Sequence, residues 1–238
     1  MTIDRFTPAT ALRIVSSGAK AGDGAMASET LLKGQVLSFT ASPFEGDPAA
    51  SARLDEAVLI RDGRIAEVGA VARLREAAPE ADLDDLGAAL ITAGFVDAHA
   101  HSPQTAIIAS WGKRLIDWLN TYTFPEEMRF GDPAYAAEVA GRYLDLTLAN
   151  GTTTVASYCT IHPESVTAFF NAAEVRGLRA AAGKTCMDRN APEGLCDTAQ
   201  AAYDESKALL QAWHGRGRLS YVITPRFSPT SSPEQLSA

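Results

Sequence analysis

The stretch GFVDAHAH, residues 94–101, decides the fold of this chain and points to its chemistry. It closes an apolar run that starts at Ala89, which predicts a buried strand ending in two histidines one position apart. Side chains at positions i and i+2 of a strand point to the same face, so both rings can reach one metal ion. Imidazole suits zinc, and a catalytic zinc normally takes three protein ligands. We therefore predict that His99 and His101 are two ligands of a zinc site, against the alternative of two polar side chains that end a strand.

Apolar strands alternate with amphipathic helices after this point, which is typical of βα units that build a parallel sheet. The predicted helices start at Pro133, at Pro163 and near Asp197, which with Gln200 resembles a capping box. The predicted strands are Leu90–His101, Thr152–Thr160, Arg179–Met187 and Leu219–Ser228.

The predicted fold class is α/β, an incomplete (β/α)8 TIM-like barrel. A complete barrel has roughly 250 residues, whereas residues 91–238 hold about four βα units, the front half of such a barrel. In a barrel of this kind the active site lies at the carboxyl ends of the strands, where His99, His101 and Arg226 fall.

Two segments precede the predicted barrel. Residues 1–30 lack periodicity and are rich in small residues, which predicts a flexible extension. Residues 31–90 are predicted to form a small β domain of the sandwich type. Within it, the strands Ala57–Ile60 and Arg64–Val68 flank Asp62 and Gly63, a dipeptide that favours a type I′ hairpin turn.

Composition limits the partners and the compartment. A net charge of -8 disfavours a protein that holds nucleic acid, because that affinity rests largely on Lys and Arg. Three cysteines without CxxC spacing indicate neither a disulfide framework nor a cysteine zinc site, and they favour a reducing cytoplasm. The sequence has no apolar leader and no apolar stretch long enough for a membrane span. We predict a cytoplasmic protein with a small-molecule substrate.

Five motifs together carry a family resemblance. The stretch at residues 94–101 resembles the first-strand signature of the amidohydrolase superfamily. Four further segments resemble the guanine deaminase family: LIDWLNTYTFP at 115–125, NGTTT at 150–154, KTCMDR at 184–189 and TPRF at 224–227. The resemblance runs from about Val36 to the last residue. It implies zinc-dependent hydrolysis of guanine to xanthine and ammonia in purine metabolism, with one zinc per complete site and a homodimeric complete protein.

The same resemblance assigns roles to individual residues. It makes His99 and His101 metal ligands, Gln104 a purine contact, and Arg226 with Phe227 the pair that recognises the base. A glutamine amide offers an acceptor and two donors to a purine edge. An arginine fork matches the O6 and N7 acceptors of guanine, and the amino group of adenine in that place would cost roughly 1–3 kcal/mol. Apart from the family, a solvated loop amide and a surface salt bridge are the alternatives for Gln104 and Arg226.

Trp118 and Phe124 fit either an apolar wall against the purine or plain core. The third histidine, the acid/base carboxylate and the metal-binding aspartate of the family are expected beyond residue 238, so no catalytic residue is predicted here. We expect weak zinc binding, no turnover by this chain alone, and self-association through an uncovered sheet edge. The alternatives are an amidohydrolase that deaminates a pterin, cytosine or triazine ring, and a non-catalytic fragment or pseudoenzyme.

Overall fold

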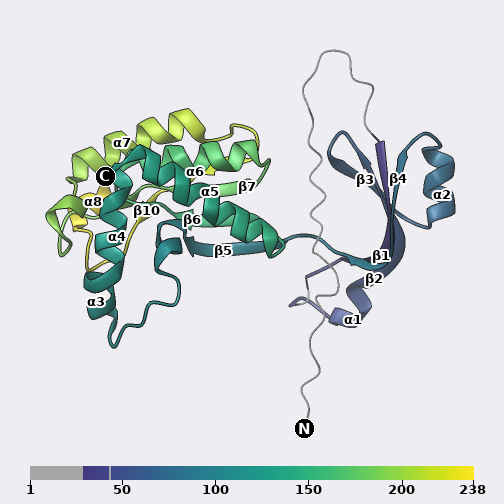
Figure 1. Cartoon of the computed structure of the whole chain (residues 1–238), viewed down its shortest axis with the longest axis horizontal. Helices are drawn as coiled ribbons and strands as arrows, with labels where there is room; N and C mark the ends of the chain where they lie inside the picture. Colours follow the sequence, from purple (N-terminus) through teal and green to yellow (C-terminus); the bar gives the residue numbers. More distant parts are fainter. Residues whose placement is uncertain (1–28, 43) are drawn as a thin grey trace, which may run out of the picture. The chain divides into compact units, whose positions relative to one another are not determined.

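The computed structural model describes residues 29–42 and 44–238. The predicted extension over residues 1–30 lies outside the described residues apart from its last two positions, which already belong to a strand. The chain divides into two compact units, residues 1–93 and 94–238 (Figure 1). Within the described part of the chain, no helix is long and apolar enough to cross a membrane.

The first unit is built on one four-stranded sheet with the order β3-β2-β1-β4. The turn between β2 and β3 has positive φ at Asp62 (48°) and Gly63 (71°), which confirms the predicted type I′ hairpin. Apolar side chains cover both faces, with Leu31 packed toward α2 and Leu32 in a separate cluster. The elements are β1(Glu29–Phe39), α1(Pro48–Ser51), β2(Ala52–Arg61), β3(Arg64–Gly69), α2(Val71–Ala77) and β4(Asp82–Ile91).

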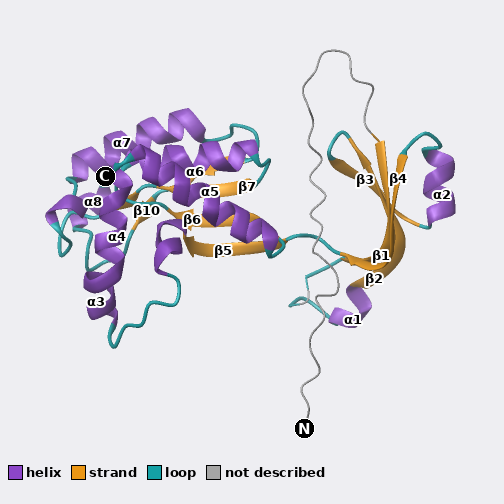
Figure 2. Ribbon diagram, in the orientation of Figure 1, coloured by secondary structure: helices purple, strands orange, loops and turns teal. Residues whose placement is uncertain are grey.

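The second unit has a parallel sheet with the order β5-β6-β7-β9 and a separate parallel pair, β8 with β10. Helices and strands alternate along this unit (Figure 2), which confirms the predicted α/β fold. Its strands are β5(Phe95–His101), β6(Thr152–Tyr158), β7(Arg179–Gly183), β8(Thr185–Cys186), β9(Leu219–Tyr221) and β10(Thr224–Pro225). Its helices are α3(Leu115–Trp118), α4(Phe124–Met128), α5(Pro133–Ala149), α6(Pro163–Val175), α7(Ala199–Trp213) and α8(Pro233–Ser237), with short turns η1(Ser102–Ile107), η2(Leu119–Thr123), η3(Arg129–Gly131) and η4(Glu193–Leu195).

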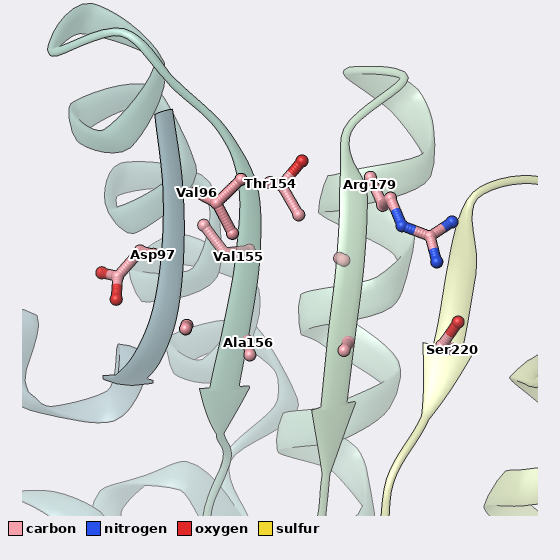
Figure 3. Close-up of a pocket in the computed structure, with 10 residues that line it drawn as sticks. Val96, Asp97, Thr154, Val155, Ala156, Arg179 and Ser220 are labelled. Carbon is pink, nitrogen blue, oxygen red and sulfur yellow. The ribbon is translucent and has the colours of Figure 1, made fainter. Parts of the chain in front are cut away.

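Helices α5, α6 and α7 cover one face of the parallel sheet. Val155 and Ala180 point into a core that holds Phe169, Phe170 and Trp213 from two of these helices. Because side chains alternate along a strand, the neighbouring positions face the other way. That opposite face lines a hollow of about 170 Å³ across four strands, with mostly short side chains such as Thr154, Ala156 and Ser220 and the longer Arg179 (Figure 3). The helix-covered face therefore supplies the core of the unit.

The first predicted barrel strand, Leu90–His101, is wrong at its start. Leu90 and Ile91 end β4, where they pair with β1 of the first unit, and β5 begins only at Phe95. Gly94 precedes β5 in a place where a Cβ atom would lie 2.2 Å from the Oγ1 atom of Thr153, so a larger residue does not fit. An apolar run that passes from one strand into the next gives no periodicity signal at the break.

The later predicted strands are also too long. Strand β6 ends at Tyr158, β7 stops at Gly183, and the segment predicted as Leu219–Ser228 splits into β9 and β10. The chain after β9 crosses closely over Gly183, because a Cβ atom there would lie 1.9 Å from the carbonyl oxygen of Val222. The interruption places the fully buried Lys184 between β7 and β8.

The predicted helix starts are confirmed at Pro133 and Pro163. The predicted capping box at the start of α7 is wrong, because the Thr198 hydroxyl caps this helix by accepting from the Ala201 amide at 3.1 Å. The Asp197 carboxylate is instead used by Lys184. A buried ammonium thus takes the carboxylate that the local pattern assigned to the helix.

Helix α3, the π-helical turn η2 and helix α4 follow one another without a break. Pro125 lies at the start of α4 and has no N–H for the backbone ladder, and a local π turn is one way in which a helix accommodates that loss. The segment brings Glu126 and Glu127 into the interior, where both are buried.

Candidate functional site

The carboxyl ends of the parallel strands meet at one edge of the second unit. The register pairs His101 at the end of β5 with Tyr158 of β6, and Tyr158 with Gly183 of β7. Arg226 directly follows β10, whose Pro225 pairs with Cys186 of β8. The predicted metal and substrate residues therefore come from strand ends that share this edge, as in the active sites of barrel enzymes.

The two histidines lie side by side at the end of β5. Their ring centroids are 5.3 Å apart, and the Tyr158 ring stacks on His101 at 4.9 Å with an interplanar angle of 12°. His99 is exposed and His101 is half-buried. Over residues 29–42 and 44–238 no group of three or more His, Cys, Asp or Glu side chains is placed to hold a metal ion. The described part of the chain thus offers a pair of imidazole donors.

The electrostatic setting keeps His101 in the form that binds metals. Burial, together with electrostatic repulsion from Arg226 and His99, lowers the pKa of His101 to about 4. At neutral pH the ring is therefore uncharged and retains a nitrogen lone pair, which is the form that coordinates zinc. The chemistry of this donor pair fits a zinc ion.

A cavity of about 330 Å³ opens beside His101, within the usual size range of small-molecule sites. His101 and Gln104 line it together with Trp118, and Ile107 and Ile108 add an apolar wall. Gln104 reaches the cavity from η1, the turn that directly follows the histidine strand. One predicted metal ligand and one predicted purine contact thus share a cavity with an apolar lining.

Arg226 is buried and paired with a carboxylate that the sequence analysis did not identify. The Arg226 side chain is 6% exposed, and its Nη1 atom donates to Oε2 of Glu127 at 2.5 Å. The Glu127 side chain is 1% exposed. The Nε2 atom of Gln104 donates to the other oxygen of Glu127 at 3.4 Å. Arg226 is therefore no surface salt bridge, and one carboxylate connects the two predicted purine contacts.

Phe227 packs with aromatic residues of the α3–α4 segment. It lies against a buried cluster that contains Phe124 and, at its border, Trp118. The Phe124 ring centroid is 5.7 Å from the Cζ atom of Arg226. Phe124 is buried in this core, whereas Trp118 takes part in both the core and the cavity wall.

Sequence patterns missed Glu127 and Tyr158. The signal for Glu127 was the pair of adjacent acidic residues, Glu126 and Glu127, between the apolar residues of the short helix α4. A carboxylate in an apolar segment is seldom buried without a partner, so this pair indicated a buried ion pair. Tyr158 ends the strand next to the histidines, and that position at a neighbouring strand end is the signal that could have found it.

Comparisons with known proteins point in one direction. The model of the amidohydrolase family matches residues 90–238, and that of an imidazolonepropionase-like composite domain of bacteria matches residues 57–81. The chain is 45% identical over 183 residues to a guanine deaminase of Escherichia coli (strain K12), covering 76% of this chain and 42% of the relative. The chain spans less than half the length of that relative.

Solved structures agree on the fold. A crystal structure of guanine deaminase from C. acetobutylicum with bound guanine in the active site superposes with a TM-score of 0.78 at 29% identity, covering 88% of this chain and 49% of that one. An atrazine chlorohydrolase from Arthrobacter aurescens complexed with zinc gives a TM-score of 0.71 at 21% identity, with 87% and 48% covered, and shows likeness of fold alone.

Proposed function

Because the chain belongs to the amidohydrolase family, we propose that it forms the metal-binding and purine-recognising part of a zinc-dependent guanine deaminase. The reaction is the hydrolysis of guanine to xanthine and ammonia. The observation that carries the proposal is the convergence of His101, Gln104 and Arg226 on one edge of the sheet, beside a cavity with an apolar wall. The similarity to guanine deaminases over most of the chain supports the same substrate.

Recognition of guanine rests on Arg226, Gln104 and Phe227. The free N–H groups of a buried guanidinium suit the O6 and N7 acceptors of guanine, and adenine presents an amino group at the first of these positions. The amide of Gln104 adds an acceptor for a ring N–H group. The Phe227 ring contributes apolar surface beside Arg226, which suits the face of a purine.

His99 and His101 are the residues that would hold the zinc ion. A bound zinc supplies activation of a water molecule and polarisation of the reacting group at neutral pH. The stacked Tyr158 ring holds the orientation of His101, and the low pKa of His101 keeps a proton from competing for its nitrogen. The remaining ligands and the acid/base carboxylate are not assigned to residues of this chain.

The proposal includes a cytoplasmic location and a homodimeric assembly of the complete protein. The absence of CxxC spacing among the three cysteines supports a reducing compartment. The net charge of -8 favours a small substrate over nucleic acid.

Zinc and guanine binding by the complete gene product test the proposal. Bound zinc is measured by atomic emission, and guanine binding by calorimetry, in the parent protein and in a His99→Asn/His101→Asn variant. We expect the variant to lose zinc. The matched control is His214→Asn, because His214 is an exposed histidine at the end of α7. Equal zinc content in the double variant and the control would contradict the metal assignment, and absence of guanine binding by the parent would contradict the substrate.

A further inference from the structure

Glu127 occupies an unusual place in the second unit. It is a carboxylate with a 1% exposed side chain on α4, and both of its oxygens accept from residues of the candidate purine site. Oε2 accepts from Arg226, which lies 99 positions later in the sequence, and Oε1 accepts from Gln104. Burying a carboxylate is unfavourable unless it is paired and hydrogen-bonded, so Glu127 and Arg226 need each other.

The carboxylate determines which way the Gln104 amide points. An ionised carboxylate only accepts hydrogen bonds, so the group of Gln104 that faces it must be the NH₂ group. The carbonyl oxygen of Gln104 is thereby turned away from Glu127 and left as an acceptor. Gln104 lines the cavity, so this acceptor is available to a bound molecule there.

The same carboxylate orients the guanidinium of Arg226. One nitrogen, Nη1, is bound to Glu127, which restrains the guanidinium and leaves the N–H groups of Nε and Nη2 as donors. Gln104 therefore presents an acceptor at the cavity wall, and Arg226, held by the same carboxylate, keeps free donors. A 6-oxopurine has the complementary edge, with an acceptor at O6 and a donor at N1, whereas a 6-aminopurine has the donor and the acceptor in the reverse order.

We propose that Glu127 is a positioning residue that fixes this pattern of donors and acceptors and thereby sets the preference for 6-oxopurines over 6-aminopurines. The inference rests on the proposed function, because it assumes that the cavity binds a purine. Glu127 itself does not touch the purine in this account. It acts through Gln104 and Arg226.

Glu127→Gln separates this role from general support of the fold. A neutral amide can donate as well as accept, so Gln104 is free to turn over, and Arg226 loses the charge opposite it. The matched control is Glu126→Gln, because Glu126 is the buried neighbour on α4 and bonds Tyr135 and Arg129 instead. The readouts are the dissociation constants for hypoxanthine and adenine, kcat and KM for guanine, zinc content and Tm, all in the complete gene product.

Hypoxanthine is the useful 6-oxopurine because it has no 2-amino group to lose. We expect Glu127→Gln to weaken hypoxanthine binding about tenfold or more while adenine binding stays the same or improves, so that the ratio of the two constants collapses. The change for guanine should fall mainly on KM, with zinc content unchanged. Glu126→Gln should keep the ratio within about twofold.

An unchanged hypoxanthine to adenine ratio in Glu127→Gln would overturn the inference, as would an equal loss of both purines. If Glu127→Gln does not fold, Glu127→Asp decides, because the shorter carboxylate keeps its charge but cannot reach both partners. The ratio should then fall at least threefold, and an unchanged ratio overturns the inference. Measurements on the parent protein distinguish failure of the proposed function from failure of the inference alone. If the parent protein does not bind hypoxanthine more tightly than adenine, the proposed function is refuted, and the inference with it.

Discussion

Loss of the buried Lys184 ammonium should destabilise the second unit far more than loss of Glu205, the more exposed of its two carboxylate partners. The Lys184 side chain is 0% exposed, and its Nζ atom lies 2.5 Å from Oδ2 of Asp197 and 3.1 Å from Oε2 of Glu205. The Asp197 side chain is 8% exposed and that of Glu205 is 41% exposed. Burial raises the pKa of Asp197 even with the lysine beside it, so its charge depends on that partner.

The magnitude follows from these exposures. Lys184→Met leaves the Asp197 carboxylate buried without a cation, which costs about 3–5 kcal/mol. The amide of Gln235 still donates to Asp197 at 2.7 Å, which places the expected value near the lower end, about 3 kcal/mol. Glu205→Gln removes a partner that is open to solvent, and it should cost about 0–1 kcal/mol.

Urea unfolding followed by tryptophan fluorescence measures both values. All three tryptophans of the sequence, Trp111, Trp118 and Trp213, lie within residues 94–238, so the signal reports on the second unit. The free energy of unfolding should fall by about 3 kcal/mol for Lys184→Met and by less than about 1 kcal/mol for Glu205→Gln. Equal losses in the two variants would refute the argument from burial.

Three further predictions concern the site, the thiols and pH. Arg226→Lys removes the planar fork but keeps the charge, so the KM for guanine should rise about tenfold or more at unchanged zinc content, and an unchanged KM would remove Arg226 from recognition. Burial raises the pKa of Cys159 to about 12 and also raises that of Cys186. Iodoacetamide at pH 8 should therefore modify Cys196 first in the native protein. Early labelling of Cys159, measured by peptide mass spectrometry, would count against this. Burial lowers the pKa of His162 below its ordinary 6.5. At pH values between the native pKa and 6.5, the unfolded chain therefore binds a proton that the native state does not. The free energy of unfolding should therefore fall as the pH drops through about 6.5, and the pH slope should be shallower in His162→Gln; equal slopes would disprove the assignment.

The parts of the fold that the sequence predicts are those that local patterns control. The Asp62-Gly63 hairpin and the starts of α5 and α6 follow from turn and capping chemistry within a few residues. The breaks at Gly94 and Gly183 depend on close approach of distant segments, to Thr153 and Val222 respectively. No pattern along one segment reports what lies across from it, so the strands were predicted too long.

The candidate site divides in the same way. His99 and His101 share a face because of strand geometry, and Arg226 is found from its place near the carboxyl end of a predicted strand. The link between Gln104, Glu127 and Arg226 joins three separate segments, so it became visible only with the structure. Asp197 illustrates the converse error, since a local capping pattern lost to a buried lysine 13 positions away in the sequence.

Ammonia release from guanine and from adenine, at neutral pH and with bound zinc quantified in the same sample, tests the central claim most directly. The complete gene product is predicted to release ammonia from guanine in proportion to its zinc content, with little or none from adenine. Release from adenine but not guanine, or no release from guanine by a fully zinc-loaded protein, would contradict the account.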